Sequence, residues 1–412
     1  MVENEVRYQE SLISPIVLSE IQPEYIQDFL DPFIPYLPID LTQEFRLPVK
    51  IRYKDTKKFN PILRLAKPKE GKDIAKIVKE DYEGTYPYKE MEDPRELKKM
   101  IKSGKYKFIV FLNDEREIIG STCFVLDFKE KKGYVRTFVV KKEWLGYLDA
   151  SKAYITASLM VMNKYRDKIL IWWGEARTAD AKSQYINRQC GIRPIAWLPN
   201  KDMFYNKIES DIMIVGYNRN IFKFHRINKV PKFIFPVLNC FSFADSQYQL
   251  GEYIIEEPLI DLDPQRIRDL KKNLRFEVER DKYMYTTIRF TFNNSDSYFQ
   301  FLYTPKVANF EKTEYRVKNL EELYVFIKEF KRMAEKYEVR YMESRVSAYK
   351  PSHQKIFYMY GFTPRGYIPA FKLDSAKNYF EDCILFNCFR MDLVKGFEVI
   401  PEGKFLLELL AF

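Results

Sequence analysis

CGIRPIAWLP, from Cys190 to Pro199, has a near repeat in YGFTPRGYIP, from Tyr360 to Pro369. In both stretches a glycine follows a helix-like segment, and a hydrophobic residue leads into a short strand between two prolines. The glycine and both prolines recur at a spacing of 170 residues. A repeat of this kind predicts two tandem copies of one fold.

The match extends beyond the two quoted stretches. GEARTA (174–179) aligns with MESRVS (342–347) if a gap of two residues is allowed, and the shared core is Glu-x-Arg. The other matching positions are Gln184 with Gln354, Ile186 with Ile356, and Trp197 with Tyr367.

Composition indicates two domains and no membrane segment. The chain has 412 residues, of which 46% are hydrophobic and 16% aromatic, enough for two separate cores. No run of about 18 apolar residues appears, and the start, MVENEVRYQE, lacks the pattern of a secretory signal. We therefore expect a cytoplasmic protein without a membrane partner.

Cysteine and histidine usage argues against several chemistries. The five cysteines form no C-x-x-C pair, and the two histidines, His225 and His353, are far apart in sequence. A disulfide framework, a metal site and Ser-His or Cys-His catalysis are therefore not expected. The net charge of +10 favours an anionic partner such as a nucleotide, coenzyme phosphates or nucleic acid. The alternative is a solubility charge spread over the surface.

Hydrophobic periodicity predicts an α/β (α+β) fold, with helices on a mixed, mainly antiparallel sheet. In the first half we expect strands at 62–66, 107–112, 118–128, 133–140, 168–173 and 210–217, and helices at 73–82, 94–101, after Asp149 and up to Cys190. In the second half we expect strands at 283–292, 298–302, 314–317, 339–346 and 382–389, and helices at 264–273, 320–337 and up to Tyr360.

This pattern divides the chain into four segments. Residues 1–58 are rich in proline and predict an extended arm with one short helix near Glu24–Leu30. Residues 59–220 form the first expected domain, 221–249 a linker, and 250–412 the second domain.

The order of strands and helices, ending in helix–glycine–strand, resembles the GNAT (N-acetyltransferase) superfamily. Residues 61–218 resemble a full copy, and about 250–392 resemble a degenerate one. The resemblance implies acetyl-CoA or another acyl-CoA as co-substrate and an amine as acceptor. It also implies that the fourth and fifth strands splay apart around the thioester. A loop of pattern Gln/Arg-x-x-Gly-x-Gly/Ala then binds the pyrophosphate through backbone N–H groups.

In this chain the corresponding loop is VKKEWLGYLDASK (140–152). Gly146 takes the first glycine position, but Glu143 and Leu148 depart from the pattern, and Asp149 adds a second carboxylate near the phosphates. The resemblance places an oxyanion-binding N–H around Val139–Lys141. The expected cofactor-binding residues are Val139, Val140, Lys141, Leu145, Gly146, Tyr147, Leu148, Asp149 and Ala150. The alternative is that Gly146 is only a turn residue and Asp149 an ordinary N-cap.

The loop of the second copy, TEYRVKNLEELY (313–324), contains no glycine, and Asn319 directly precedes the helix. Bulky side chains would block a close backbone cradle. We therefore expect that the second domain does not bind coenzyme A and instead completes the substrate cleft, pairs the domains or stabilises the first.

Glu175 is the candidate catalytic residue, because a buried carboxylate on the fifth strand can accept a proton from an amine. The alternative is an ion pair with Arg177 or a neighbouring chain. The tyrosine that many family members use as general acid, four residues before the helix-ending glycine, corresponds here to Asn187.

The loop YEGTYPYKEME (82–92) supplies the expected substrate-binding residues Tyr86, Tyr88 and Glu90, which could hold a cationic amine by stacking and charge. The alternative is that its tyrosines only pack on the sheet. Trp172 and Trp173 alternate across a strand, so one faces the core, and Trp173 is expected to line the cleft.

Three functions stay open. The first is an acyl-CoA-dependent N-acyltransferase that acts on a small-molecule or peptide amine. The second is an aminoacyl-tRNA-dependent, FemX-like transferase whose basic charge binds tRNA phosphates. The third is a non-catalytic tandem GNAT-like module that binds a ligand or a partner protein.

Overall fold

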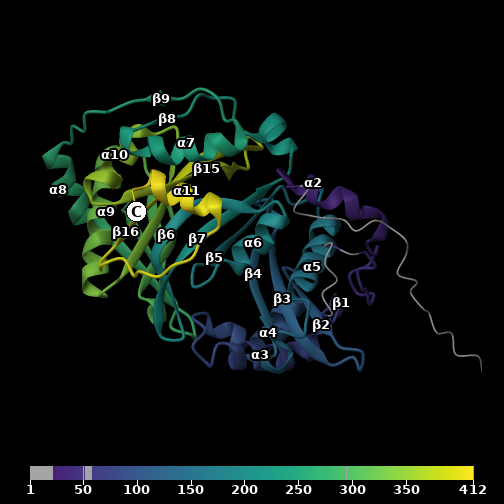
Figure 1. Ribbon diagram of the computed structural model, residues 1–412. Helices are drawn as coiled ribbons and strands as arrows, with labels where there is room; N and C mark the ends of the chain where they lie inside the picture. The colour runs from purple at the N-terminus through teal and green to yellow at the C-terminus, as the bar shows by residue number, and fades with distance from the viewer. Residues whose placement is uncertain (1–21, 50, 52–57, 294, 412) are drawn as a thin grey trace, which may run out of the picture. The chain divides into compact units, whose positions relative to one another are not determined.

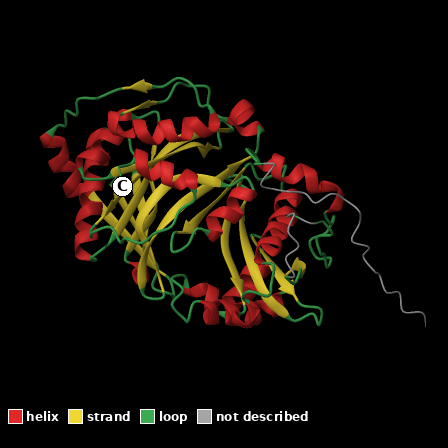
Figure 2. Cartoon of the chain, in the orientation of Figure 1, coloured by secondary structure: helices red, strands yellow, loops and turns green. Residues whose placement is uncertain are grey.

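The computed structural model describes residues 22–49, 51, 58–293 and 295–411. The first part of the predicted arm, including Pro15, lies outside the described residues. The chain divides into two compact units. Unit 1 comprises Met1–Glu175, Lys182–Arg193 and Ile214–Arg219, and unit 2 comprises Ala176–Ala181, Pro194–Met213 and Asn220–Phe412. Both units combine strands with helices (Figure 1, Figure 2).

The described part of the arm carries the short helix that the sequence predicts. This helix, α2 (Ile26–Leu30), is followed by a 3-10 turn at Asp31–Tyr36. Phe29 and Phe33 are fully buried, and α2 packs on α5 (Ala150–Lys164). The Pro23 carbonyl accepts hydrogen bonds from Arg193 at 3.0 Å and Arg188 at 3.3 Å. The arm is thus attached to unit 1 by buried rings and by two guanidinium groups.

Gly191, from the first quoted stretch, lies where the arm approaches. Its φ is +76°, a conformation that favours glycine, and an added Cβ would lie 3.1 Å from the Tyr25 carbonyl oxygen. Its counterpart Gly361 has a similar φ of +79° but has nothing within 4 Å of an added Cβ. The two glycines therefore share a backbone conformation but differ in their surroundings.

The sheet of unit 1 confirms the expected fold class, since it is mixed and mainly antiparallel. Its strands lie in the order β1 (Ile62–Leu65), β2 (Tyr106–Leu112), β3 (Ile118–Asp127), β4 (Lys132–Val140), β5 (Ile171–Arg177) and the end of β7 (Lys207–Tyr217). Neighbours from β1 to β4 pair antiparallel, and β4 pairs parallel with β5. β5 starts later than predicted, because the N–H groups of Lys168 and Ile169 both donate to the Tyr165 carbonyl in a turn.

Two of the helices that cover the sheet of unit 1 begin at an aspartate that caps them. The helices that cover the sheet are α3 (Gly71–Asp81), α4 (Pro94–Lys102), α5 and α6 (Lys182–Gln189). Asp93 caps α4 by accepting from the Arg95 N–H at 2.8 Å, and Asp149 caps α5 by accepting from the Lys152 N–H at 3.0 Å. Residues Ala153–Met162 of α5 are all buried, as expected for a helix that is surrounded by core.

The strands of unit 2 are also mainly antiparallel. Their order is β7, β6 (Arg193–Phe204), β15 (Thr363–Asp374), β16 (Tyr379–Phe389), β14 (Tyr341–Ser347), β13 (Asn309–Arg316), β12 (Tyr298–Thr304), β11 (Thr286–Phe292) and β10 (Leu274–Arg280). The β13–β14 pair is parallel. A small separate sheet joins β8 (Lys232–Phe233) to β9 (Ile254–Ile255). The helices are α7 (Leu238–Tyr248), α8 (Pro264–Asn273), α9 (Leu320–Lys336), α10 (Pro351–Met359) and α11 (Pro401–Leu409).

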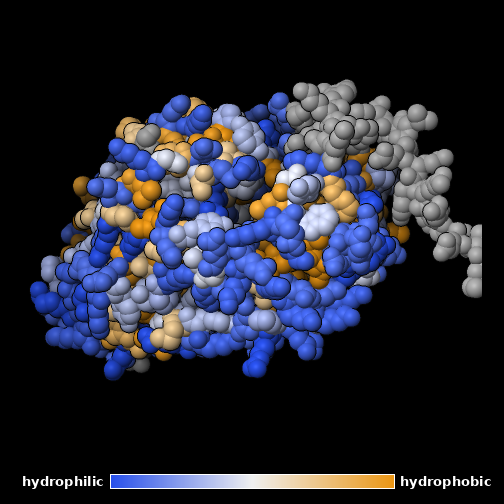
Figure 3. All heavy atoms as spheres, turned by 60° about the horizontal axis from the view of Figure 1, so that its bottom comes forward, coloured by the Kyte–Doolittle hydropathy of each residue, from blue (hydrophilic) through white to orange (hydrophobic). Residues whose placement is uncertain are grey.

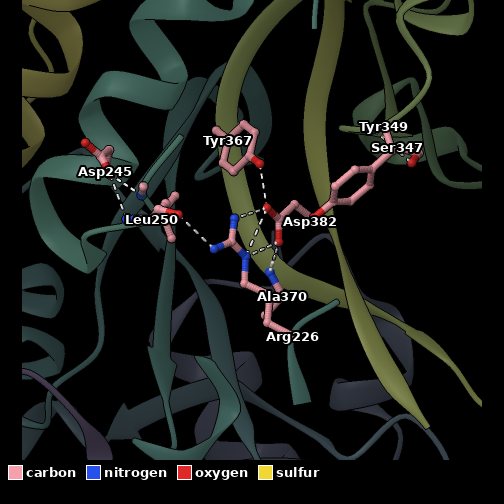
Figure 4. A network of polar contacts seen from close by, with 9 residues as sticks. Arg226, Asp245, Leu250, Ser347, Tyr349, Tyr367, Ala370 and Asp382 are labelled. Atoms are coloured by element: carbon pink, nitrogen blue, oxygen red, sulfur yellow. Dashed lines mark hydrogen bonds and ion pairs between the residues drawn. The ribbon is translucent and has the colours of Figure 1, made fainter. Parts of the chain in front are cut away.

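Residues 221–249, expected to be a linker, form part of unit 2. They contain α7, whose Cys240, Phe241 and Phe243 are buried. Just before it, Arg226 donates from Nε and Nη2 to the fully buried Asp382 at 3.0 and 2.7 Å (Figure 4). Burial would lower the pKa of Arg226, but Asp382 outweighs burial and raises it. This segment is therefore anchored by a buried ion pair.

Asp382 is fully hydrogen bonded within this network. It also accepts from the Tyr367 hydroxyl at 2.5 Å and from the Ala370 N–H at 2.8 Å, while Arg226 Nη1 donates to the Leu250 carbonyl at 3.1 Å (Figure 4). A buried carboxylate whose hydrogen-bonding positions are all occupied holds the surrounding segments together and is not a reactive group.

We expect Gly133→Ala to destabilise the chain by about 1–3 kcal/mol, as overpacking usually does. Gly133 pairs with Trp172 across β4 and β5, and an added Cβ would overlap the Trp172 ring. Urea unfolding measures the loss. The control is Lys129→Ala at an exposed position, which should change stability by no more than about 0.5 kcal/mol. Equal effects of the two variants would contradict this packing.

We expect the stability of unit 2 to fall as the pH drops from about 6.5 towards 4. Burial, and then the charges of Lys350 and Lys372, lower the pKa of His353 to about 4. The neutral ring therefore stabilises the fold fully above the unfolded-state pKa, and this contribution is lost as the pH falls through the window. His353→Gln should unfold with a weaker pH dependence than the wild type, as measured by urea titrations across this range. Identical pH profiles would refute the effect.

Candidate functional site

The parallel strands β4 and β5 are paired over only part of their length. Four rungs join Lys132 to Ile171, Gly133 to Trp172, Tyr134 to Trp173 and Val135 to Gly174. Within the described residues no further pair joins the two strands. The buried Trp172 packs edge-on against Phe124, with ring centroids 6.0 Å apart, which holds the paired end together. The strands diverge from Arg136 and Glu175 onward.

A β-bulge marks the point of divergence. In the β3–β4 pair, Cys123 is opposite Thr137 and Phe124 is opposite Val135, so Arg136 is the extra residue. A bulge bends its strand and re-aims the inserted side chain. Arg136 forms an ion pair with Glu90 and lies over the Tyr88 ring at 5.4 Å. Burial would lower the pKa of Arg136, but Glu90 outweighs burial and raises it.

The tyrosine-rich loop packs on β4 at this bulge. The Tyr86 ring contacts the rings of Tyr82 and Tyr88, with centroids 4.5 and 5.9 Å away, and its hydroxyl lies 3.2 Å from Thr137 Oγ1. The structure thus brings the three predicted substrate-binding residues Tyr86, Tyr88 and Glu90 together at the divergence of the strands. Tyr86 is only 4% exposed, so its ring mainly packs on the sheet, and a cationic amine would have to compete with Arg136 for Glu90.

Arg136 is a site residue that sequence reasoning missed. The one signal for it is a charged residue inside the otherwise apolar strand GYVRTFVV (133–140). Its partner Glu90 lies 46 residues earlier, so no local pattern could connect the two.

Trp173 and Glu175 lie on the same face of β5, because alternate residues of a strand face the same side. Trp173 packs on Tyr134 of β4, with ring centroids 4.5 Å apart, and both Trp173 and Glu175 are half-buried. Glu175 is the first residue after the last rung, at Gly174. The predicted catalytic carboxylate is therefore located at the start of the divergence.

The backbone of β4 offers donors on that side. The Lys141 N–H donates to the Ile119 carbonyl of β3 at 2.9 Å, so it is not available for the oxyanion role that was expected around Val139–Lys141. Because N–H directions alternate along an antiparallel strand, the Val139 N–H also faces β3. The N–H groups of Phe138 and Val140 face the side from which β5 has diverged. Of the three predicted residues, Val140 has the suitable orientation.

The predicted pyrophosphate loop, residues 145–150, is hydrogen bonded within the chain. Gly146 has a φ of +87°, and Leu145 and Tyr147 are 57% and 71% exposed. The N–H groups of Tyr147 and Leu148 both donate to the Trp144 carbonyl, that of Asp149 to the Phe59 carbonyl, and that of Ala150 to the Leu148 carbonyl. These groups would have to exchange partners before they could bind a phosphate.

Phe59, which sequence reasoning also missed, closes this loop. It forms an isolated parallel bridge with Leu148, donates to the Tyr147 carbonyl at 2.9 Å and packs on Trp144 with ring centroids 5.2 Å apart. Nothing in its local sequence indicates that it meets residues about 90 positions later, because the contact depends on the tertiary fold.

Asn187, four residues before Gly191, is hydrogen bonded to a tyrosine of another helix. The Tyr154 hydroxyl in α5 donates to Asn187 Oδ1 at 2.6 Å, and Asn187 Nδ2 donates to the Ser183 carbonyl at 2.8 Å. Burial, and then the neighbouring Cys190, raise the pKa of Tyr154. This pair joins α5 to α6 inside unit 1.

The described residues contain no group of three or more His, Cys, Asp or Glu side chains that could hold a metal ion. Nor do they include a helix that is long and apolar enough to cross a membrane. The five cysteines are free thiols, and all but the half-buried Cys388 are buried.

No protein-family model matches the chain, and no curated protein matches it. Among solved structures, ribosomal-protein-S5-alanine acetyltransferase from Vibrio fischeri is similar at 16% identity, over 42% of this chain and 98% of that one, with a TM-score of 0.33. A spermidine N-acetyltransferase from Vibrio cholerae is similar at 12% identity, over 38% and 94% of the two chains, with a TM-score of 0.33. A ribosomal L7/L12 alpha-N-protein acetyltransferase is similar at 14% identity, over 38% and 92%, with a TM-score of 0.30. Likenesses this weak carry no argument about activity, which has to come from the site itself.

We expect Glu90→Gln to cost about 3–5 kcal/mol of stability, because it leaves the Arg136 guanidinium, whose side chain is only 12% exposed, without its carboxylate. Urea unfolding measures the loss. The matched control is Glu83→Gln, which breaks the exposed pair between Glu83 and Lys142 at 3.0 Å and should cost no more than about 1 kcal/mol. If Glu90→Gln were as mild as the control, the pair would not hold the loop on β4.

Proposed function

We propose that unit 1 is an acyl-CoA-dependent N-acyltransferase that acts on a small-molecule or peptide amine. The observation that carries the proposal is the divergence of β4 and β5 after Val135 and Gly174. A main-chain donor lies on one strand and a carboxylate on the other, and these are the two groups that transfer of an acyl group to an amine requires.

In this proposal each group has one role. The Val140 N–H binds the carbonyl oxygen of the thioester and stabilises the negative charge that develops there. Glu175 accepts the proton that the amine loses, either directly or through a water molecule. Tyr88 and Trp173 flank the approach of the amine, and Glu90 positions Arg136. Holding both reactants at one place supplies much of the rate enhancement.

The fit to coenzyme A differs between the two ends of that molecule. At the acyl end, the orientation of the Val140 N–H suits a thioester carbonyl. At the other end, the loop Leu145–Ala150 does not fit a pyrophosphate while all its N–H groups except that of Gly146 donate within the chain. We propose that these residues meet the phosphates only after the bridge between Phe59 and Leu148 has opened.

We also propose that the chain contains two copies of one fold, with the second copy, in residues 250–412, unable to bind coenzyme A. Support comes from the strand order β1-β2-β3-β4-β5-β7-β6, which recurs as β10-β11-β12-β13-β14-β16-β15. Its parallel pair, β13 with β14, has two rungs. Asn319 caps α9 by accepting from the Glu322 N–H at 3.1 Å, in a loop without glycine.

The test measures acetyl-CoA binding by calorimetry and thiol release from acetyl-CoA in the presence of spermidine or a peptide with a free N-terminal amine. We expect Glu175→Gln to lower turnover by about 10²–10⁴-fold, the usual contribution of a general base, with unchanged affinity for acetyl-CoA. Glu115→Gln, the same change on an exposed turn, is the control and should behave as the wild type. Absence of both a binding signal and thiol release in the wild type would overturn the proposal.

A further inference from the structure

Unit 1 contains a cavity of about 850 Å³ between α3, α4, the β2–β3 turn and the end of β4. Seven basic side chains line it, against three carboxylates. α3 and α4 lie at the bottom of Figure 1, the side that is turned forward in Figure 3, and the lower part of the surface in that view is mainly hydrophilic. No role in the proposed acyl transfer uses this cavity.

Helix geometry brings the cations together. Lys72 and Lys76 are four residues apart on α3, and Arg95 and Lys98 are three residues apart on α4, so each pair shares one helix face. The two helices approach closely at Gly71, where an added Cβ would lie 2.9 Å from the Lys98 backbone nitrogen. This close approach places two basic faces side by side, although like charges repel one another.

The carboxylates of the cavity do not neutralise these cations. Glu70 is held by Arg64 in a bidentate pair at 2.8 and 2.9 Å. Burial would raise the pKa of Glu70, but the hydrogen bonds from Arg64 and the Lys67 N–H outweigh burial and lower it. Glu70 is therefore an anion that is already compensated within the fold. The other two carboxylates of the cavity, Asp73 and Glu117, are outnumbered by its seven cations.

Four of the seven cations have no ion-pair partner in the part of the chain that the structure describes; these are Lys69, Lys72, Arg95 and Lys98. The other three have neighbours outside the cavity: Lys76 has Glu80 at 3.7 Å, Arg116 has Glu44 at 2.8 Å, and Lys141 has Glu143 at 3.7 Å. The concave surface thus concentrates positive charge that the chain itself does not compensate.

We infer that this cavity binds the phosphate groups of a ligand that carries several of them. A terminal phosphate group brings a charge of about −1.5 to −2 and three acceptor oxygens in a small volume, and each backbone phosphate of a nucleic acid brings one negative charge. Several such groups suit several cations around a space the size of a small-molecule site. Isolated carboxylates have a lower charge density. The same chemistry is offered by a nucleotide-type cofactor and by a stretch of nucleic-acid backbone, and the experiment separates these two sources.

The test uses the full chain and inorganic tripolyphosphate as the probe, with binding measured by calorimetry. We expect the double variant Lys72→Glu/Lys98→Glu to lose at least about tenfold in affinity, and each lysine removed to reduce the salt slope by about 1. The matched control is Lys79→Glu, an exposed lysine on α3 that does not line the cavity, and it should keep wild-type affinity. Melting temperatures without the probe verify that all variants are folded.

Competition identifies the source of the phosphates. Displacement of tripolyphosphate by coenzyme A supports a nucleotide-type ligand, and displacement by single-stranded RNA supports a nucleic-acid backbone. Polyglutamate that displaces the probe equally well would overturn the inference, as would an absence of probe binding or an equal loss in Lys79→Glu. Glu175→Gln should retain probe binding in full, so failure of this inference can be told apart from failure of the proposed acyl transfer.

Discussion

The four parallel rungs between β4 and β5 are the constraint on which the rest of unit 1 depends. Because Gly133 lacks a side chain, the Trp172 ring can lie over it, and this contact fixes the paired end of the two strands. The bulge at Arg136 then bends β4. If pairing continued, the N–H groups of Phe138 and Val140 would be used up in the ladder. The short pairing is thus what leaves main-chain donors for chemistry.

The two places in unit 1 that we propose for anions differ in the donors that they offer. In the loop 145–150 three backbone donors, those of Tyr147, Leu148 and Asp149, bind the Trp144 and Phe59 carbonyls. In the cavity beside it the donors are flexible lysine and arginine side chains. Backbone groups recognise an anion by fixed geometry, whereas lysines recognise it by charge and adapt to its shape. Charge recognition by side chains is also the more sensitive to salt.

The sequence predicts those parts of the fold that local signals specify. α4 and α8 follow an Asp-Pro pair that caps and starts the helix, and both were predicted at or near their observed bounds. β10 (LRFEVER) was missed although apolar and charged residues alternate along it, as they do in a half-buried strand. In the structure every side chain of this strand except Leu274 is exposed. α7 was missed because the prolines before it indicate a break in structure, whereas its burial comes from the fold.

In the candidate site, too, local sequence signals indicate some features, and contacts between distant residues determine the others. Glu175 lies on the fifth strand, where the sequence places it, directly after the last rung at Gly174, and the hydroxyl of Tyr86 in the tyrosine-rich loop lies 3.2 Å from Thr137 Oγ1 of β4. The pairing of Glu90 with Arg136 and the closure of the loop by Phe59 join residues that are distant in sequence. The bulge at Arg136 determines which N–H groups of the following residues face β3, and therefore that the Lys141 N–H does so. No residue type in the sequence indicates where the bulge lies.

Gly191 and Gly361 have nearly equal φ angles but tolerate different substitutions. At Gly361 an added side chain meets open space, so asparagine, which enters the left-handed region more readily than other residues, is compatible with that turn. At Gly191 any side chain presses on the Tyr25 carbonyl at 3.1 Å, close to where Arg188 and Arg193 hold Pro23. Substitution of Gly361 therefore affects only one turn. Substitution of Gly191 also weakens the packing of the N-terminal arm on the rest of unit 1.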